Sequence, residues 1–249
     1  MIPITIISRI RNESLLLPDF LNHIDKFGSE FWFFDDASTD ESYDILNSHP
    51  KTKCVIRNNF HNINQTFVQT AQRHLLLELA KKNTKNDWIM LIEPDEKVEF
   101  DFNKLEEYDR QNVSGIFFKL FDSYITSEDQ KPYKKGDLSK LRKYFGPEYR
   151  EICFLFKKDK AKFDLTMPAC RQPNIEGNTI VDGFVKHYGK SLSIDHWNET
   201  VEYYIRSVPM LAEKWMQRRG KAIHEKSDFG RELLTWDQIT SGEHPIVKI

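Results

Sequence analysis

Three acidic side chains stand within four residues at Glu93-Pro94-Asp95-Glu96, directly after the apolar run at residues 88–92. Carboxylates crowded at the end of a buried strand repel one another unless a cation or hydrogen-bond donors lie among them. A hard divalent cation such as Mg²⁺ or Mn²⁺ takes one or two protein carboxylates and completes its shell with phosphate oxygens and water. The pattern therefore indicates a metal site, and a solvated acidic turn is the alternative.

Two more polar segments follow apolar runs earlier in the chain. Ser8-Arg9-Ile10-Arg11-Asn12-Glu13 follows residues 4–7, and Asp35-Asp36 follows residues 31–34. In an open parallel sheet, ligands bind where the strands deliver their carboxyl ends. We therefore expect Asp36 and Asp95 to approach a common cleft.

The first hundred residues alternate between strand and helix patterns. The predicted elements are a strand at 4–7, a helix at 15–27 that stops at Gly28, strands at 31–34 and 54–56, a helix at 65–82 and a strand at 88–92. Such alternation predicts right-handed crossovers and an α/β fold, with a mainly parallel sheet that has helices on both sides.

The alternation of strand and helix patterns weakens beyond residue 100. Strands are predicted at 115–118 and 152–156, and residues 122–147 form a charged excursion with no sustained period. An apolar stripe over 201–215 predicts one C-terminal helix. The whole chain, 1–249, is predicted to be a single domain.

Composition excludes several classes of function. A formal net charge of -2 gives no field that would draw nucleic acid or an anionic membrane. The three cysteines match neither a disulfide framework nor a paired metal motif. No run approaches the length of a transmembrane segment and no secretory signal opens the chain. These features predict a cytoplasmic protein.

The order of these motifs resembles glycosyltransferase family 2. The segment from Ile7 to Glu13 followed by Phe33-Phe34-Asp35-Asp36-Ala37-Ser38-Thr39-Asp40 is similar to the family's opening, and Arg73-His74 and Glu93-Pro94-Asp95 stand where the family has an R-N pair and a D-x-D triplet. The resemblance covers residues 2–100, with a weaker echo over 150–190. It implies a GT-A fold, in which residues 1–100 form the Rossmann-like donor half and residues 101–249 form the acceptor-side half with the C-terminal helix.

The resemblance also implies an activity. The protein would move a sugar from a nucleotide-diphosphate sugar to a glycan or other hydroxyl acceptor, with inversion and with Mn²⁺ or Mg²⁺. The implied donor-binding residues are Ser8, Arg9, Arg11, Asp35, Asp36, Arg73 and Glu93.

For several of these residues an alternative role stays open. Asp36 would bind the base or ribose, or act as a helix cap. Arg73 would meet phosphate or pair with an acid, and an exposed helix arginine is the alternative. Asp95 would bind the metal, whereas Glu93 stands where the family has Asp, a departure that favours ribose contact or an indirect role.

Two features of the later half complete the implied site. Val185-Lys186-His187-Tyr188-Gly189 resembles the family's H-y-G segment, so His187 would reach the metal or the diphosphate, or else be structural. The segment 167–171, where the catalytic base is expected, contains no acid. Asp122, Asp164 and Asp182 are therefore the candidates for the base, and the 122–147 excursion and the C-terminal helix are expected to frame the acceptor.

Two other functions remain open at this point. A GT-A-like nucleotidyltransferase normally carries a glycine-rich phosphate loop after its first strand, and this chain has no glycine before Gly28. A non-catalytic nucleotide-sugar-binding module is compatible with Glu93 and with the unassigned base. Metal-dependent hydrolysis of a nucleotide sugar would distinguish an enzyme from a binder.

Overall fold

The computed structural model describes residues 2–249, which divide into two compact units. Unit 1 comprises the chain up to Pro94, Phe100–Phe118 and Ile152–Gly183. Unit 2 comprises Asp95–Glu99, Lys119–Glu151 and Phe184–Ile249. The predicted single domain, with a donor half and an acceptor half that meet at residue 100, stays a prediction.

Unit 1 contains most of the regular elements. They are β1 (Ile4–Ile10), α1 (Leu17–Ile24), β2 (Gly28–Asp35), α2 (Ser42–Ser48), β3 (Thr52–Arg57), α3 (Val68–Asn83), β4 (Trp88–Leu91), the 3₁₀ turn Phe102–Lys104, α4 (Leu105–Arg110), the 3₁₀ turn Lys158–Lys160, β8 (Ala161–Lys162) and β9 (Asn174–Ile175). Three longer strands, β6 (Val113–Tyr124), β7 (Tyr144–Lys157) and β10 (Asn178–His187), contribute residues to both units.

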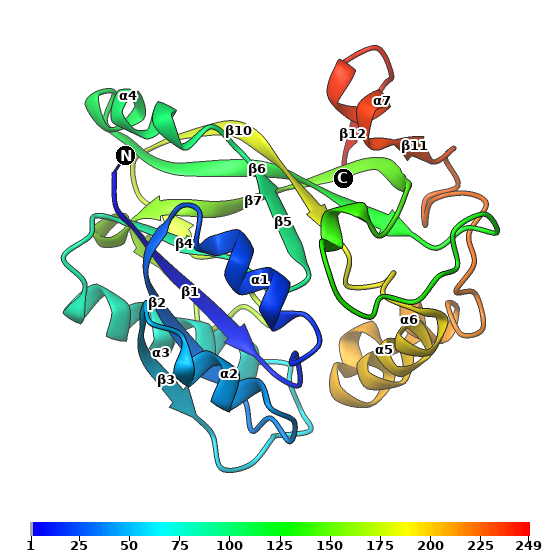
Figure 1. Cartoon of the computed structure of the whole chain (residues 1–249), viewed down its shortest axis with the longest axis horizontal. Helices are drawn as coiled ribbons and strands as arrows, with labels where there is room; N and C mark the ends of the chain where they lie inside the picture. The colour runs from blue at the N-terminus through cyan, green and yellow to red at the C-terminus, as the bar shows by residue number, and fades with distance from the viewer. Residues whose placement is uncertain (1) are drawn as a thin grey trace. The chain divides into compact units, whose positions relative to one another are not determined.

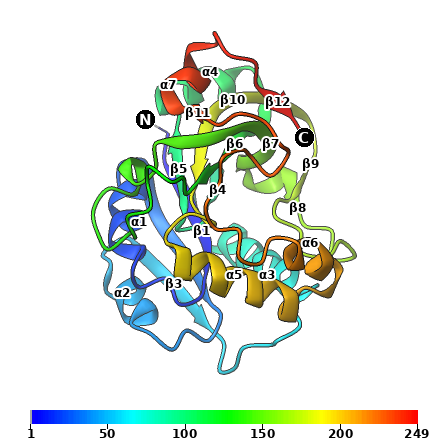
Figure 2. The same cartoon turned by 90° about the vertical axis from the view of Figure 1, so that its right-hand side faces the viewer.

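The sheet of unit 1 is mainly parallel, with the order β3-β2-β1-β4-β7. Strands β1 to β4 run parallel, and β7 pairs antiparallel with β4. Helices α1 and α2 lie on one face of the sheet and α3 lies on the other, as both views show (Figures 1 and 2). This arrangement confirms the predicted α/β class and the helix-flanked parallel sheet.

Apolar residues on both faces of the central strands explain this layering. Ile4, Ile6 and Ile7 of β1 are fully buried, as is Phe33 of β2. Burying such a side chain contributes about 1.5–3 kcal/mol relative to exposure, so the four residues together strongly favour a doubly covered sheet.

The prediction that Gly28 stops the first helix was wrong. Helix α1 ends at Ile24, and Gly28 is the first residue of β2. A Cβ atom at position 28 would lie 2.6 Å from Ile6 Cγ1 and 2.6 Å from the Phe31 ring. Close packing between strands, and not a helix cap, therefore requires glycine here.

Unit 2 contains the remaining elements. They are β5 (Glu96–Glu99), the 3₁₀ turn Leu138–Lys140, α5 (Ile194–Ser207), the 3₁₀ turn Pro209–Leu211, α6 (Ala212–Met216), β11 (Leu234–Thr235), α7 (Trp236–Ser241) and β12 (Val247–Lys248). Strand β5 pairs antiparallel with β10, and this register sets Glu96 opposite His187.

The predicted excursion at 122–147 is shorter in the structure. Strand β6 extends to Tyr124 and β7 begins at Tyr144, so only the segment between them lacks long strands. The side chain of Arg142 is fully buried in this segment. Its guanidinium donates hydrogen bonds to the backbone carbonyls of Lys131, Ser191 and Leu192 and to the Asp129 carboxylate. One side chain thus orders much of the connection.

The prediction of a single C-terminal helix over 201–215 was also wrong. Helix α5 ends at Ser207, Val208 has φ −133° and ψ 76°, and α6 begins at Ala212. Pro209 lacks a backbone N–H and disfavours helical geometry in the residue before it. The apolar stripe still forms one cluster, because Tyr204 of α5 stacks on Trp215 of α6 with ring centroids 4.4 Å apart.

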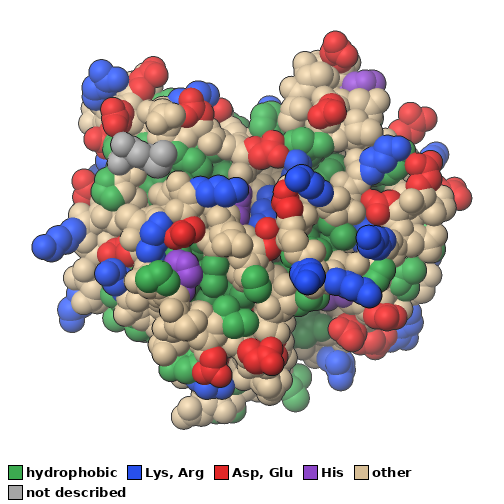
Figure 3. Space-filling view, viewed as in Figure 1, with side chains coloured by type: hydrophobic (Ala, Val, Ile, Leu, Met, Phe, Trp, Pro, Cys, Tyr) green, Lys and Arg blue, Asp and Glu red, His purple; other side chains and the backbone are tan. Residues whose placement is uncertain are grey.

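The surface carries charges of both signs, as the small net charge of the sequence suggests. Basic and acidic side chains are interspersed on the face drawn in Figure 3, with no field of one sign. Among the described residues, no helix has the length and apolar character needed to cross a membrane.

Candidate functional site

The fully buried carboxylate of Asp36, just past β2, joins four polar side chains of unit 1. Its Oδ2 accepts a hydrogen bond from Arg9 Nη2 at 2.6 Å and lies 2.7 Å from His61 Nδ1. Its Oδ1 accepts from Asn58 Nδ2 at 2.9 Å and from Gln72 Nε2 at 2.7 Å. Burial raises the pKa of Asp36, but Arg9 and the other donors outweigh it and hold the pKa below its usual value.

These contacts define what Asp36 does within unit 1. A carboxylate offers about four acceptor positions, and all four are used here. The helix-cap alternative was wrong, because the N-cap of α2 is Glu41 and no side chain bonds there. Asp36 therefore orders Arg9, His61, Asn58 and Gln72, while contact with a nucleotide stays a prediction.

Two arginines, Arg9 near the end of β1 and Arg11 just past it, reach the same region. Arg9 also donates from Nε to Gln72 Oε1 at 2.5 Å and from Nη2 to Gln65 Oε1 at 3.0 Å. Arg11 Nη1 donates to the carbonyls of Asp36 and Ala37 at 2.7 and 3.2 Å. Ala37 has φ +55°, so the Arg11 contacts support a turn in the left-handed region.

Ser8 and Asp35 are also buried at this edge of the sheet. Asp35 Oδ1 accepts from the Ser38 amide at 3.3 Å, and Asp35 Oδ2 lies 3.2 Å from Arg57 Nε without hydrogen-bond geometry. Ser8 Oγ has no hydrogen-bond partner among residues 2–249. A buried hydroxyl without a partner is uncommon, which keeps Ser8 a candidate for ligand contact.

Glu93, which follows β4, lies between two guanidinium groups of unit 1. Arg73 Nη2 donates to Glu93 Oε1 at 2.6 Å, and Arg171 Nη1 lies 2.8 Å from the same oxygen. Burial opposes ionisation, but Arg171 and Arg73 together lower the pKa of Glu93 to about 2. The alternative that Arg73 pairs with an acid is thus the one observed. Arg171 was not predicted as a site residue, although it lies in the segment where an acid was expected and missing.

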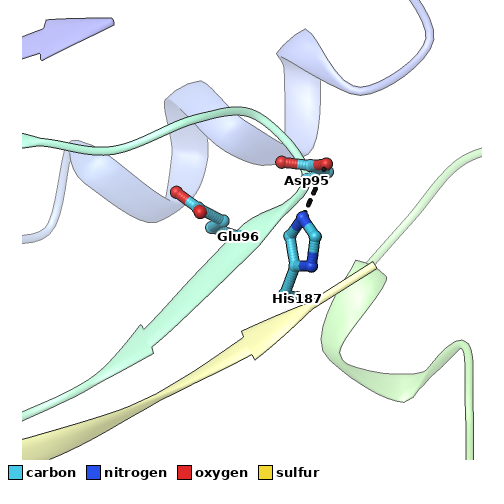
Figure 4. A group of neighbouring side chains, drawn as sticks. All are labelled: Asp95, Glu96 and His187. Carbon is cyan, nitrogen blue, oxygen red and sulfur yellow. Dashed lines mark ion pairs between the residues drawn. The ribbon is translucent and has the colours of Figure 1, made fainter. Parts of the chain in front are cut away.

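A second cluster lies in unit 2 and consists of Asp95, Glu96 and His187 (Figure 4). One ligand atom of each residue lies within 4.8 Å of those of the other two. His187 Nε2 lies 3.3 Å from Asp95 Oδ2, and the Asp95 carbonyl accepts a hydrogen bond from the Tyr188 amide at 2.8 Å. The antiparallel register of β5 and β10 therefore brings together residues that are ninety positions apart.

The chemistry and shape of this cluster fit a divalent cation. Two carboxylates and one imidazole form a mixed oxygen and nitrogen donor set of the kind that Mn²⁺ accepts. A Cβ atom at Gly189 would lie 2.8 Å from His187 Nε2 and closer still to Asp95 Oδ2. A larger residue here would therefore crowd both donor atoms unless their side chains moved. Glu96 joins the set, whereas the sequence predicted only that it would orient the loop.

Asp122 contacts the other nitrogen of the same imidazole. Its Oδ1 lies 2.5 Å from His187 Nδ1 and 2.7 Å from Arg150 Nη2, and its Oδ2 lies 3.1 Å from Lys190 Nζ. Burial opposes its ionisation, but Lys190, Arg150 and His187 hold the pKa of Asp122 well below its usual value. Burial likewise opposes protonation of His187, but Asp95 and Asp122 raise its pKa to about 10. A carboxylate behind the imidazole is the usual support for a metal-binding histidine.

The other two candidates for the base have different partners, in unit 1. Asp164 Oδ1 accepts from the amide and hydroxyl of Thr166 at 2.9 and 2.6 Å. Asp182 Oδ2 accepts from Lys104 Nζ at 2.9 Å and Tyr108 OH at 2.7 Å. Of the three acids, Asp122 alone joins the cluster of Asp95 and His187. A catalytic role for each acid stays a prediction.

Asp36 belongs to unit 1 and Asp95 to unit 2. The expectation that they face a common cleft stays a prediction.

Comparison with known proteins gives a likeness in architecture. No family model matches the sequence, and no curated protein matches it. TarS of S. aureus in complex with UDP-GlcNAc is similar over 49% of this chain and 35% of that chain, at 17% identity and a TM-score of 0.38. TarS 1-349 in complex with UDP is similar over 87% and 71%, at 11% identity and a TM-score of 0.46. A further TarS structure matches over 87% and 42%, at 12% identity and a TM-score of 0.47.

This chain thus spans about a third of the first TarS chain and under half of the third. At these identities and TM-scores the likeness says nothing of activity.

Proposed function

We propose that this protein is a GT-A glycosyltransferase that moves a sugar from a nucleotide-diphosphate sugar to an acceptor hydroxyl. The observation that carries the proposal is the donor set of Asp95, Glu96 and His187, and Gly189 adds no side chain beside Asp95 and His187. In the sequence this set begins four residues after β4. Mn²⁺ or Mg²⁺ bound there would neutralise charge on the departing diphosphate.

In unit 1, the proposed nucleotide contacts come from side chains that Asp36 holds in place. Because Asp36 already accepts four hydrogen bonds, we assign nucleoside contact to the groups that it fixes, chiefly Arg9 and His61. Side chains locked in this way lose little further freedom when a ligand binds. Arg73 and Arg171 both pair with Glu93, and guanidinium groups of this kind suit a phosphate because they can donate two parallel hydrogen bonds.

An inverting transfer needs a base that takes the proton from the acceptor hydroxyl. Catalytic bases work best with a pKa near the operating pH. The pKa of each candidate acid, Asp122, Asp164 and Asp182, lies below its usual value. This observation favours the second candidate function, a nucleotide-sugar-binding module that does not catalyse transfer.

The first experiment tests metal-dependent nucleotide binding. Calorimetry should show that UDP binds more tightly with Mn²⁺ than with a chelator, and Asp95→Asn should remove most of that difference because an amide loses the charge that holds a hard cation. Asp237→Asn removes the same charge from an exposed position in α7 and should leave the difference intact. Equal UDP affinity with and without metal would refute the proposal.

The second experiment separates the enzyme from the binder. The protein is incubated with a panel of nucleotide sugars that includes UDP-GlcNAc, and release of the nucleoside diphosphate is followed with and without Mn²⁺. Metal-dependent release supports a transferase. Tight, metal-dependent binding without release or transfer supports the binding module.

A further inference from the structure

Unit 1 contains a cavity of about 460 Å³ that lies apart from the groups around Asp36 and Glu93. Its lining residues are His74 of α3 together with Lys162, Phe163, Asp164, Leu165 and Asn174. None of them is among the partners of Asp36 or Glu93 named above. Small-molecule sites in proteins typically enclose about 300–1,000 Å³, so the cavity is large enough to hold a ligand.

The wall of this cavity is fixed to α3 at both ends. Lys81 Nζ donates a hydrogen bond to the Ala161 carbonyl at 3.1 Å, and Thr70 Oγ1 donates to the Met167 carbonyl at 3.0 Å. The lining residues 162–165 lie between these two carbonyls in the sequence. A wall that is already tied down loses little further freedom when a ligand binds.

Three polar side chains of the lining, those of His74, Lys162 and Asn174, have no hydrogen-bond or ion-pair partner among residues 2–249. His74 Nδ1 is buried, so Nε2 is the ring nitrogen left to meet a ligand. Asp164 accepts from Thr166 through Oδ1, which leaves Oδ2 for a further donor. The lining therefore offers donors and acceptors that the protein itself does not use.

The composition of the lining favours a neutral ligand that carries many hydroxyl groups. Lys162 and Asp164 have opposite formal charges, so the lining has no excess charge that would select an anion or a cation. Phe163 and Leu165 add an apolar surface, and Leu165 is 51% exposed. Apolar walls with a few polar groups of both kinds are usual in small-molecule sites.

We propose that this cavity binds a saccharide. A sugar hydroxyl both donates and accepts hydrogen bonds, so it can pair with the acceptor-only carboxylate of Asp164, the donor-only ammonium of Lys162 and the amide of Asn174. The C–H face of the sugar ring would cover the exposed side chain of Leu165. This site goes beyond the proposed transferase function and does not rest on it.

The test is an NMR titration of the full chain with four free sugars: glucose, galactose, mannose and N-acetylglucosamine. At least one sugar should give saturable shifts of the His74 ring nitrogens, and backbone amide shifts give its dissociation constant. His74→Phe keeps a ring and removes both nitrogens, so it should weaken binding about threefold to tenfold, the effect of one lost hydrogen bond. His23→Phe makes the same change in α1, on the other face of the sheet, and should leave binding unchanged.

A second variant covers the case in which His74→Phe fails to fold. Asn174→Ala changes an exposed position of the lining and should also weaken binding about threefold to tenfold. Asn178→Ala changes an exposed asparagine outside the lining and is its control. The proposal is overturned if none of the four sugars gives saturable shifts, or if His74→Phe and Asn174→Ala both bind as tightly as the unmodified protein.

A further titration separates this site from that of the nucleotide sugar. It is repeated with the protein saturated by UDP-GlcNAc and Mg²⁺. An unchanged dissociation constant supports a separate saccharide site, whereas loss of sugar binding shows that the sugar of the donor occupies the cavity and overturns the assignment. If UDP-GlcNAc produces no shifts of its own while sugar binding still depends on His74, the transferase function fails and the saccharide site stands.

Discussion

Oδ1 of Asp122 lies 2.5 Å from Nδ1 of His187, whose other ring nitrogen lies 3.3 Å from Asp95. In this arrangement Asp122 fixes the orientation of the imidazole and leaves Nε2 directed toward the candidate metal ligands. The role is one of positioning, and it can be distinguished from that of a catalytic base.

We expect Asp122→Asn to lower Mn²⁺ affinity by about 10-fold to 100-fold, the usual effect of removing a carboxylate that supports a metal-binding histidine. Calorimetric titration with Mn²⁺ measures this directly. Asp182→Asn, which removes a carboxylate paired with Lys104 and Tyr108, should leave Mn²⁺ affinity unchanged. Lost transfer with full Mn²⁺ affinity in Asp122→Asn would instead identify Asp122 as the base.

Gly189→Ala should weaken Mn²⁺ binding at least about tenfold, because the new Cβ atom would crowd His187 Nε2 and Asp95 Oδ2. Gly146→Ala is the matched control, since its Cβ atom would lie 2.8 Å from Glu148 Oε2 and away from the metal ligands. Both variants should lose thermal stability, but only the first should lose metal affinity. Normal Mn²⁺ binding by Gly189→Ala would count against the site.

Asp36→Asn should lower the free energy of unfolding by about 2–4 kcal/mol without any ligand, because Arg9 loses its buried charged partner. Urea denaturation provides the measurement. Asp87→Asn, at a side chain that is 72% exposed, should change stability by less than about 0.5 kcal/mol. A residue that served only to bind ligand would leave the free protein as stable as before, and that result would contradict the structural role.

Glu93→Gln should lower the free energy of unfolding by about 2–3 kcal/mol at neutral pH, since Arg73 and Arg171 lose the charge between them. The pKa of Glu93 is lowered from 4.5 to about 2, so its stabilising contribution is complete above pH 4.5 and is lost as the pH falls toward 2. The difference between the two proteins should therefore be constant from pH 5 to 8 and should shrink below pH 4.5.

The control for this pH dependence is Glu78→Gln, which removes an exposed pair with Lys81 and should have little effect at any pH. A Glu93→Gln difference that stayed constant down to pH 2 would mean that the pKa of Glu93 is not lowered by folding.

Elements that are buried on both faces could be predicted from the sequence. The apolar runs at 4–7 and 31–34 lie inside β1 and β2, because a doubly covered strand has no polar face to interrupt the pattern. The full lengths of β6 and β7 could not be predicted, since Asp122 and Arg150 look like loop residues until their mutual ion pair is known. Helix α2 was not predicted either; it is short and its N-cap makes no side-chain bond.

The candidate site, like the fold, could be predicted only in part from the sequence. The resemblance named both Asp95 and His187, and the structure brings their side chains together. The contribution of Glu96 depends on the register between β5 and β10, and the contact of Arg171 with Glu93 joins residues seventy-eight positions apart. Neither a strand register nor a distant ion pair leaves a periodic signal in one sequence.

Arg142 has a consequence for how the chain matures on the ribosome. Its guanidinium binds the carbonyls of Ser191 and Leu192, which are synthesised about fifty residues later. Until those residues leave the exit tunnel, the connection between β6 and β7 lacks the two carbonyl partners that Arg142 binds in the folded protein. Arg142 can therefore order this connection only after about three quarters of the chain has emerged.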